Sequence, residues 1–350
     1  MQRRSHSHLG RNSLRPSALS VACPGKVPPH RCYAARRMSQ SNQNPASPNC
    51  KFFLPLACLL AACGASPSVP PQSDFDSARA WQHLETIVGF GVRSAETDGL
   101  KSTREYLMTE LKSYGLTPVL EKFEDDTPIG VVSFGNVYAD IGPADRPLVI
   151  LCTHIDTKIF KWEFVGANDS GSGTAVLLEL ARCIAKLTED SKLSYRILFL
   201  DGEESIREQW VDPDNRYGSR YHAQRLVDTG ELSRVKACVL LDLVGDKDLK
   251  LTAESYSDSR LRSIFFKTAS EIGLGAHVDG PAREILDDHL SFMAVDIPSV
   301  DLIDYDYGPN NEYWHSPKDT LENVSEASLD VIGRIVLAAL PKLQKSITGR

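Results

Sequence analysis

The chain has 350 residues, of which 39 are Lys or Arg and 46 are Asp or Glu. Nine of the basic residues and none of the acidic ones precede Asp74, so the rest of the chain carries 30 basic against 46 acidic side chains, a net charge of −16. A surface with this charge repels nucleic acid and anionic lipid, so neither is expected as a partner.

Residues 1–37 are rich in Ser, Pro and His and contain basic residues without a single acid. This composition is typical of a disordered segment, or of a start upstream of the native one, in which case Met38 is the expected initiator. An apolar stretch, F-F-L-P-L-A-C-L-L-A-A-C, follows. It is too short to cross a bilayer as a helix, which needs about 20 residues. We therefore interpret residues 38–63 as a signal segment.

The signal segment ends in L-A-A-C, a pattern that resembles the bacterial lipobox. It predicts an exported protein of the bacterial cell envelope, lipidated at Cys63 and held on the periplasmic side of the membrane by that lipid alone. The alternatives are a plain signal peptide, which gives a soluble periplasmic or secreted protein, and a mere apolar linker. Residues 64–76, with the stretch S-P-S-V-P-P-Q, are expected to form a linker, and residues 77–350 a single globular domain.

Four near-continuous apolar runs are typical of strands that are buried on both faces of a mainly parallel sheet. They are Arg146–Cys152, Tyr195–Leu200, Val235–Leu241 and Ile297–Ile303. Helical patterns occupy Ser170–Leu187, Ser219–Val227, Asp258–Ile272 and Ser325–Leu343. This alternation predicts an α/β fold, a three-layer α/β/α sandwich with a mixed, mostly parallel central sheet.

Side chains that can bind a metal recur near the ends of the predicted strands. They are His154, Asp169, Glu203, Glu204, Asp242 and His315. In open α/β sheets ligands bind outside the carboxyl ends of the strands, so we expect these side chains to converge on one crevice. Zinc takes imidazole nitrogen and carboxylate oxygen, and a catalytic zinc needs three protein ligands and an adjacent carboxylate that stays unliganded. The set therefore predicts a zinc enzyme.

Each of these residues alone has an ordinary structural interpretation. A single His after a strand is usually hydrogen-bonded, Asp169 in N-D-S-G suits a helix N-cap, and a Glu-Glu pair is usually solvated. Asp242 in L-L-D-L-V is harder to explain in this way, because an ionised carboxylate in an apolar run is costly unless it is paired or metal-bound. Their combination at strand ends favours the metal site.

The motifs G-A-N-D-S-G-S-G, D-G-E-E and W-H resemble those of the zinc aminopeptidase superfamily of the bacterial leucyl aminopeptidase type, which includes the glutaminyl-peptide cyclotransferases. Several segments are similar to the cyclase branch: F-E-D-D-T-P-I-G-V-V-S-F-G-N-V, C-T-H-I-D-T-K, L-L-D-L-V-G and D-D-H-L-S-F. A Trp-containing insertion after the glutamates, ending in Y-G-S-R, also resembles cyclases rather than aminopeptidases. The resemblance covers about residues 80–343.

The resemblance implies a role for each matching residue. It makes Asp169, Glu204 and His315 the ligands of one zinc ion, and Glu203 the general acid/base that moves a proton from the substrate amine to the leaving ammonia. It places Asp242 and Asp287 among the acids that hydrogen-bond around Glu203 and the amine, and Trp210 and Trp314 as walls of the pocket. The implied substrates are peptides or proteins with an N-terminal glutamine, and the implied product is pyroglutamate. We expect a monomer.

The sequence also departs from the animal cyclases. Asp301 stands where they have a His, so a proton relay through that position is in doubt. His154 and Asp242 match residues that bind a second zinc in the aminopeptidases, so a second ion is a candidate. A zinc aminopeptidase and a non-catalytic binding module with the same fold are the alternative functions. Cys152, Cys183 and Cys238 lie in apolar stretches and are expected to be buried free thiols.

Overall fold

The computed structural model describes residues 74–186 and 191–349. Its centre is a six-stranded sheet in the order β1-β2-β4-β3-β5-β8. The strands are β1 Val119–Thr127, β2 Gly130–Ile141, β3 Leu148–His154, β4 Ser194–Leu200, β5 Val235–Asp242 and β8 Ser299–Ile303. Strands β4, β3, β5 and β8 are parallel, and β2 runs antiparallel to both β1 and β4. The predicted mixed, mostly parallel sheet is thus confirmed.

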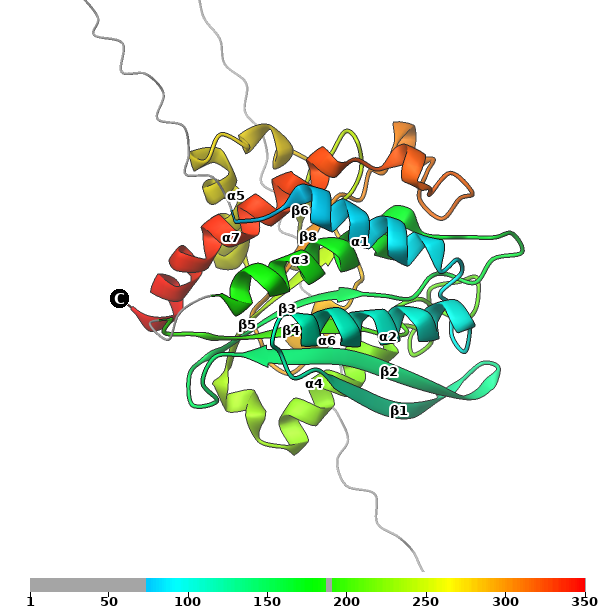
Figure 1. The fold of residues 1–350 in the computed structure, drawn as a ribbon, viewed down its shortest axis with the longest axis horizontal. Helices are drawn as coiled ribbons and strands as arrows, with labels where there is room; N and C mark the ends of the chain where they lie inside the picture. The colour runs from blue at the N-terminus through cyan, green and yellow to red at the C-terminus, as the bar shows by residue number, and fades with distance from the viewer. Residues whose placement is uncertain (1–73, 187–190, 350) are drawn as a thin grey trace, which may run out of the picture. The chain divides into compact units, whose positions relative to one another are not determined.

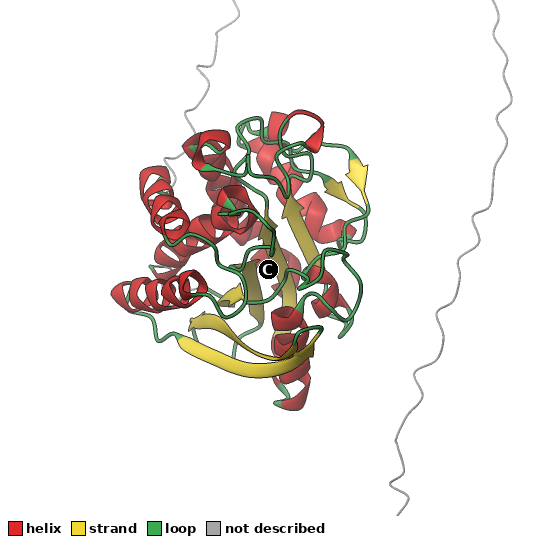
Figure 2. Ribbon diagram, turned by 90° about the vertical axis from the view of Figure 1, so that its right-hand side faces the viewer, coloured by secondary structure: helices red, strands yellow, loops and turns green. Residues whose placement is uncertain are grey.

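Helices cover both faces of this sheet (Figures 1 and 2). On one face α1 Ser77–Gly89, α2 Asp98–Ser113, α3 Gly173–Ala185 and α7 Glu326–Thr348 pack together, and α5 Ser259–Glu271 packs against α7. On the other face lie α4 Tyr217–Asp228, which contacts β2, and α6 His289–Met293, which contacts β5 and β8. The molecule therefore has the expected α/β/α layers.

The remaining elements are short. They are the π-helix η1 Ala167–Ser172, the 3₁₀ helices η2 Glu231–Arg234, η3 Gly275–His277, η4 Pro309–Asn311 and η5 Leu321–Asn323, and a parallel pair of strands, β6 Ala253–Glu254 and β7 Ala282–Arg283. The pair β6 and β7 forms a separate two-stranded sheet.

All four predicted strands are present, with ends that lie within two residues of those expected. Every residue of β3, β4 and β8 is buried, which explains why these strands read as apolar runs without alternation. The predicted helices are present as α3, α4, α5 and α7. The sequence patterns did not predict α1, α2, α6 or the antiparallel hairpin of β1 and β2.

Chain reversals around β3 bring the functional loops together. The chain leaves β3, returns through α3 to its neighbour β4, and then crosses through α4 to β5 on the other side of β3. The carboxyl ends of β3, β4 and β5 flank this switch point, where open α/β sheets bind ligands. Helix α3 starts close against the strands at Gly173, where a Cβ atom would overlap the Thr153 side chain.

The predicted signal segment and linker lie outside the described residues, apart from positions 74–76 of the linker, and so does Leu187, the predicted end of α3. Within 74–186 and 191–349, no helix combines the length and the apolar character needed to cross a membrane.

Candidate active site

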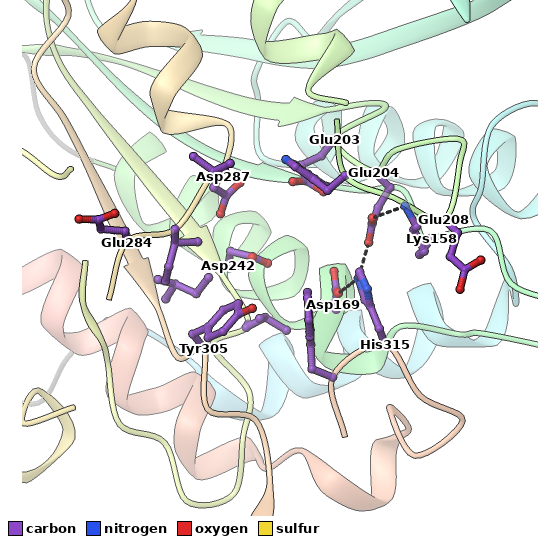
Figure 3. Close-up of a pocket in the computed structure, with 16 residues that line it drawn as sticks. Lys158, Asp169, Glu203, Glu204, Glu208, Asp242, Glu284, Asp287, Tyr305 and His315 are labelled. Carbon is purple, nitrogen blue, oxygen red and sulfur yellow. Dashed lines mark hydrogen bonds and ion pairs between the residues drawn. The ribbon is translucent and has the colours of Figure 1, made fainter. Parts of the chain in front are cut away.

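Asp169, Glu204 and His315 meet in space although they are far apart in sequence. The His315 Nε2 lies 3.2 Å from Asp169 Oδ2 and 3.0 Å from Glu204 Oε1. Figure 3 shows the three side chains turned toward one another from η1, the loop after β4 and the loop before α7. Around a tetrahedral zinc with bonds of about 2.0–2.1 Å, ligand atoms stand about 3.3 Å apart. The three residues therefore fit a zinc ion with little rearrangement.

A second group shares Asp169 with the first. The His154 Nε2 lies 3.2 Å from Asp169 Oδ1 and 3.2 Å from Asp242 Oδ1. His154 and Asp242 are the last residues of β3 and β5 rather than residues beyond the strands. Asp169 thus offers one carboxylate oxygen to each group, the arrangement in which a carboxylate can bridge two cations.

Asp319 and Arg93 hold the loop that carries Asp169. The Asp319 carboxylate accepts hydrogen bonds from the backbone N–H groups of Asn168, at 2.7 Å, and Asp169, at 3.1 Å. The buried Arg93 guanidinium donates to the carbonyls of Val165 and Gly166, at 2.6 Å and 2.9 Å. These contacts fix Asp169 without using its own carboxylate.

Asp156 positions the two glutamates. Its carboxylate oxygens each accept one backbone N–H, from Glu203 and from Glu204, both at 3.1 Å. Lys158 lies on the other side of Glu204, with its Nζ 3.8 Å from Glu204 Oε2, and donates to the Ser205 carbonyl at 2.8 Å. The pair is therefore held by its backbone, and both carboxylates are directed toward the pocket (Figure 3).

Two residues of the site have a left-handed backbone conformation. The φ angle is 49° at His315 and 50° at Leu243, the residue after Asp242. Non-glycine residues rarely adopt this region and do so where the surrounding structure enforces it, often at functional sites. The backbone at both positions therefore carries a cost that fits a functional role.

A pocket of about 440 Å³ opens over these groups. Its lining contains Asp169, Glu203, Glu204, Trp210, Asp242, Asp287, Trp314 and His315. These are all the predicted site residues except His154, which is 1% exposed and lies beneath Asp169 and Asp242. The structure therefore brings together the residues that the sequence singled out.

Aromatic rings form part of the wall. The Trp314 ring stacks on the His315 ring with 4.2 Å between centroids, and the Tyr305 ring lies 5.3 Å from Trp314. Trp210 lines the same pocket. The Y-G-S-R stretch, expected at the end of the Trp210 loop, is instead the first turn of α4.

The site carries an excess of negative charge. Burial, opposed by His154 and reinforced by Glu204, raises the pKa of Glu203 well above its usual range. Burial and the nearby Asp242 raise the pKa of Asp287 to about 7. Burial acts to lower the pKa of His315, but the carboxylates of Glu204 and Asp169 raise it to about 10. Such a site attracts a cation, and Glu204 Oε2 is buried with no hydrogen-bond partner among the described residues.

Comparison with known proteins gives a consistent result. The family model of peptidase family M28 matches residues 136–340. The chain belongs to peptidase family M28. Its resemblance to the glutaminyl cyclase branch of this superfamily is confirmed, because it is 32% identical to a glutaminyl-peptide cyclotransferase of Drosophila melanogaster in an alignment 260 residues long that covers 67% of this chain and 72% of the relative.

Solved structures of other proteins show the same fold. A glutaminyl cyclase of an Acidobacteriales bacterium superposes with a TM-score of 0.75 at 28% identity, over 80% of this chain and 99% of the other. A protein of Parabacteroides distasonis described as a Zn-dependent exopeptidase superposes with a TM-score of 0.70 at 25% identity, over 77% and 98% of the two chains. Cyclases and an exopeptidase therefore share this M28 fold.

Some residues of the site escaped the sequence reasoning. Asp156 and Lys158 belong to the motif C-T-H-I-D-T-K but were given no role, and Asp319 belongs to no motif. For Asp156 and Lys158, the available signal was their position directly after an apolar strand.

The three cysteines are buried free thiols, as expected. The Sγ atoms of Cys152 and Cys238 lie 3.4 Å apart.

Proposed function

We propose that this M28 protein is a glutaminyl-peptide cyclotransferase, which converts an N-terminal glutamine to pyroglutamate and releases ammonia. The observation that carries the proposal is a single pocket that combines a candidate metal triad, a buried Glu203 outside that triad and two Trp residues in its wall. The cyclases among its relatives, at 32% and 28% identity, support the same activity.

Asp169, Glu204 and His315 would hold one zinc ion. Their donor set of two carboxylates and one imidazole is typical of a catalytic zinc, and the fourth position would face the pocket. When bound there, the ion supplies Lewis acidity toward the γ-amide carbonyl oxygen of the substrate. His154 and Asp242 remain candidates for a second ion, which the cyclisation does not require.

Glu203 would transfer the proton. The substrate's α-amine attacks Cδ of its own side chain, so that one N–C bond forms in the ring and the bond to the side-chain nitrogen breaks. Glu203 accepts the proton that the amine loses and returns one to the departing ammonia, so no net proton is gained or lost. Burial raises the pKa of Glu203 above its usual range, which makes its carboxylate a stronger base than an exposed one.

Asp242, Asp287 and the two tryptophans would position the substrate. The carboxyls of Asp242 and Asp287 line the pocket with Glu203 (Figure 3) and can accept hydrogen bonds from the α-amine. Trp210 and Trp314 would limit the space around the glutamine side chain and exclude water. In such a pocket the substrate amine has an effective molarity of roughly 10⁵ M or more, which favours ring closure over hydrolysis.

A zinc aminopeptidase is the second candidate. It is favoured by the second group of His154, Asp169 and Asp242, which could hold another ion, and by the Zn-dependent exopeptidase with the same fold. In that enzyme Glu203 would deprotonate a water molecule instead of the substrate amine.

We further propose that the chain acts as a monomer in the bacterial envelope, anchored by a lipid at Cys63. The L-A-A-C pattern supports the anchor. Expression in a bacterial host with globomycin should leave an unprocessed precursor, and a Cys63→Ser chain that is still lipidated would refute the anchor.

Incubation with Gln-Phe-Ala and Leu-Phe-Ala side by side separates the two activities. The cyclase releases ammonia from the first peptide, with the mass loss of NH₃ and no free amino acid, and leaves the second peptide intact. Free Gln together with Phe-Ala, and faster cleavage of the Leu peptide, would establish the aminopeptidase instead.

A further inference from the structure

Three of the residues that line the pocket are solvent-exposed and mark its mouth: Glu208, Glu284 and Leu286. Glu208 lies in the loop after β4, and the other two lie between β7 and α6. Figure 3 shows Glu208 and Glu284 on opposite sides of the pocket. The proposed mechanism gives neither of them a role. Exposed carboxylates are negatively charged at neutral pH, so a substrate that extends from the pocket into solvent meets two negative charges.

The positive residues next to these two glutamates do not neutralise them. None of the ion pairs among the described residues involves Glu208 or Glu284. Arg283 precedes Glu284 in the chain but pairs with Asp306, at 2.6 Å. Arg207 precedes Glu208 but lines a different pocket, beside the turn between β1 and β2. The two carboxylates at the mouth therefore remain available to a positively charged group of the substrate.

The inner part of the pocket also lacks a free lysine or arginine. Lys158 is the only Lys or Arg in the lining among the described residues, and its Nζ donates to the carbonyls of Ser205 and Arg207, both at 2.8 Å. Asp287 is 3% exposed and lines the pocket, and its Oδ2 has no hydrogen-bond donor among the described residues. This unpartnered acceptor points to a cationic ligand independently of the two exposed glutamates, and the substrate's α-amine would supply that cation.

The mouth also offers apolar contacts beside each carboxylate. Leu286 is 55% exposed and follows Glu284 by two residues, and Trp210 follows Glu208 by two residues. Both side chains line the pocket. Lys and Arg bury their aliphatic stems against apolar surface while their charged ends stay in water. The mouth is therefore complementary to a long basic side chain, whereas a short or acidic side chain would lose one or both contacts.

We propose that Glu208 and Glu284 select the substrate by charge, so that the enzyme prefers peptides in which Lys or Arg directly follows the N-terminal glutamine. This inference rests on the proposed function, which puts the glutamine inside the pocket and makes the second residue the first to reach the mouth. The cation of that residue pairs with an exposed carboxylate, and its stem covers Leu286 or Trp210. The net charge of −16 after Asp74 adds a long-range attraction for basic peptides.

The test compares two substrates that differ in charge and hardly in shape. The full chain is offered Gln-Arg-Ala and Gln-citrulline-Ala, because citrulline replaces the guanidinium of arginine by a neutral urea group. Ammonia release gives kcat and KM at low salt and in about 0.5 M NaCl, where charges are screened over a few ångströms.

The variants are Glu208→Gln, Glu284→Gln, the double variant and the charge reversal Glu284→Lys. The matched control is Glu105→Gln, because Glu105 is an exposed glutamate of α2 that does not line the pocket. All five substitutions change exposed side chains, and the thermal midpoint of each protein is measured to show that it is folded.

We expect kcat/KM for the arginine peptide to exceed that for the citrulline peptide by about 3- to 10-fold, the effect of two exposed ion pairs. The difference should lie in KM, because these pairs are the same in the bound substrate and in the transition state. Each single variant should lose part of the preference, and the double variant and high salt should remove most of it. Glu284→Lys should reduce it more than Glu284→Gln, and the control should keep it in full.

Equal kcat/KM for the two peptides in the wild type at low salt would overturn the proposal. A preference for arginine that is undiminished in the double variant would also overturn it, because other acidic groups would then be responsible. If the wild-type chain releases no ammonia from either peptide but cleaves Leu-Phe-Ala, the proposed function fails instead. Selection by charge is then tested on Leu-Arg-Ala and Leu-citrulline-Ala, since the second residue of an aminopeptidase substrate would reach the same mouth.

Discussion

Two buried charged regions of this protein lie on different parts of the same sheet and behave in opposite ways. Beside α4, Glu121 of β1 accepts from His222 and from Asn136, both at 2.8 Å, and its Oε1 lies 3.1 Å from the Arg225 Nε. Burial acts to raise the Glu121 pKa, but these donors outweigh it and the pKa is lowered. Each charge in that region has a partner.

In and behind the pocket the acids outnumber their partners. Glu203, Asp242, Asp287 and Asp301 are buried, and burial raises the pKa of all four. If these groups served stability alone, each buried carboxylate should have a partner of opposite charge, as Glu121 has beside α4, because a buried unpaired carboxylate is costly. The excess of buried carboxyl groups over positive partners therefore indicates function. A bound cation, together with protonation of some of these carboxyl groups, would neutralise the excess.

The largest expected effect comes from removing the imidazole of the candidate metal triad. His315→Ala leaves Asp169 and Glu204 as the only ligands, so zinc should no longer bind tightly and ammonia release should fall below detection. Metal content is measured by elemental analysis of the purified protein. Survival of both metal and activity would show that the triad is wrongly assigned.

The next effect isolates proton transfer. Glu203→Gln keeps the size of the side chain and the backbone contacts with Asp156, so zinc should remain bound while kcat falls by about 10²- to 10⁴-fold. The measurement pairs zinc content with turnover of Gln-Phe-Ala. If the variant instead loses its metal, the two glutamates have exchanged roles.

The smallest effect comes from the paired charges beside α4. Glu121→Gln should reduce the free energy of unfolding by about 1–3 kcal/mol without lowering kcat, because it unpairs His222 and Arg225, and none of the three residues lines the pocket. A depressed carboxyl pKa stabilises the fold above the unfolded value of 4.5 and loses that effect as pH falls below it. Urea unfolding should therefore show wild type and variant converging in acid. If Glu121→Gln instead lowers kcat and leaves the free energy of unfolding unchanged, the region beside α4 is not purely structural.

The sequence predicts the parallel strands well, because residues buried on both faces leave an unbroken apolar run such as that of β4. It also predicts which polar residues gather, since parallel strands end at one edge of the sheet. The hairpin of β1 and β2 was missed because its exposed and buried residues mix, and its charged stretch E-K-F-E-D-D carries little apolar signal. α6 has only five residues and no capping side chain, so no periodicity marks it.

Within the site, sequence reasoning found the candidate metal ligands and catalytic acids and missed supporting residues, among them Lys158, which also lines the pocket. Asp319 is 150 residues from Asp169, whose backbone N–H it accepts, and that contact follows from tertiary structure alone. The same holds for Glu254 and His289, which meet because β6 and α6 both contact β8. Local motifs encode chemistry, whereas the supporting contacts depend on the whole fold.

Metal removal and return tests the central claim most directly. The purified full chain is stripped of metal with a chelator, and ammonia release from Gln-Phe-Ala is followed as zinc is added back. The account predicts that the metal-free protein stays folded, loses at least about 100-fold in rate and recovers at one zinc per chain. Cyclisation at the full rate by the metal-free protein would contradict it.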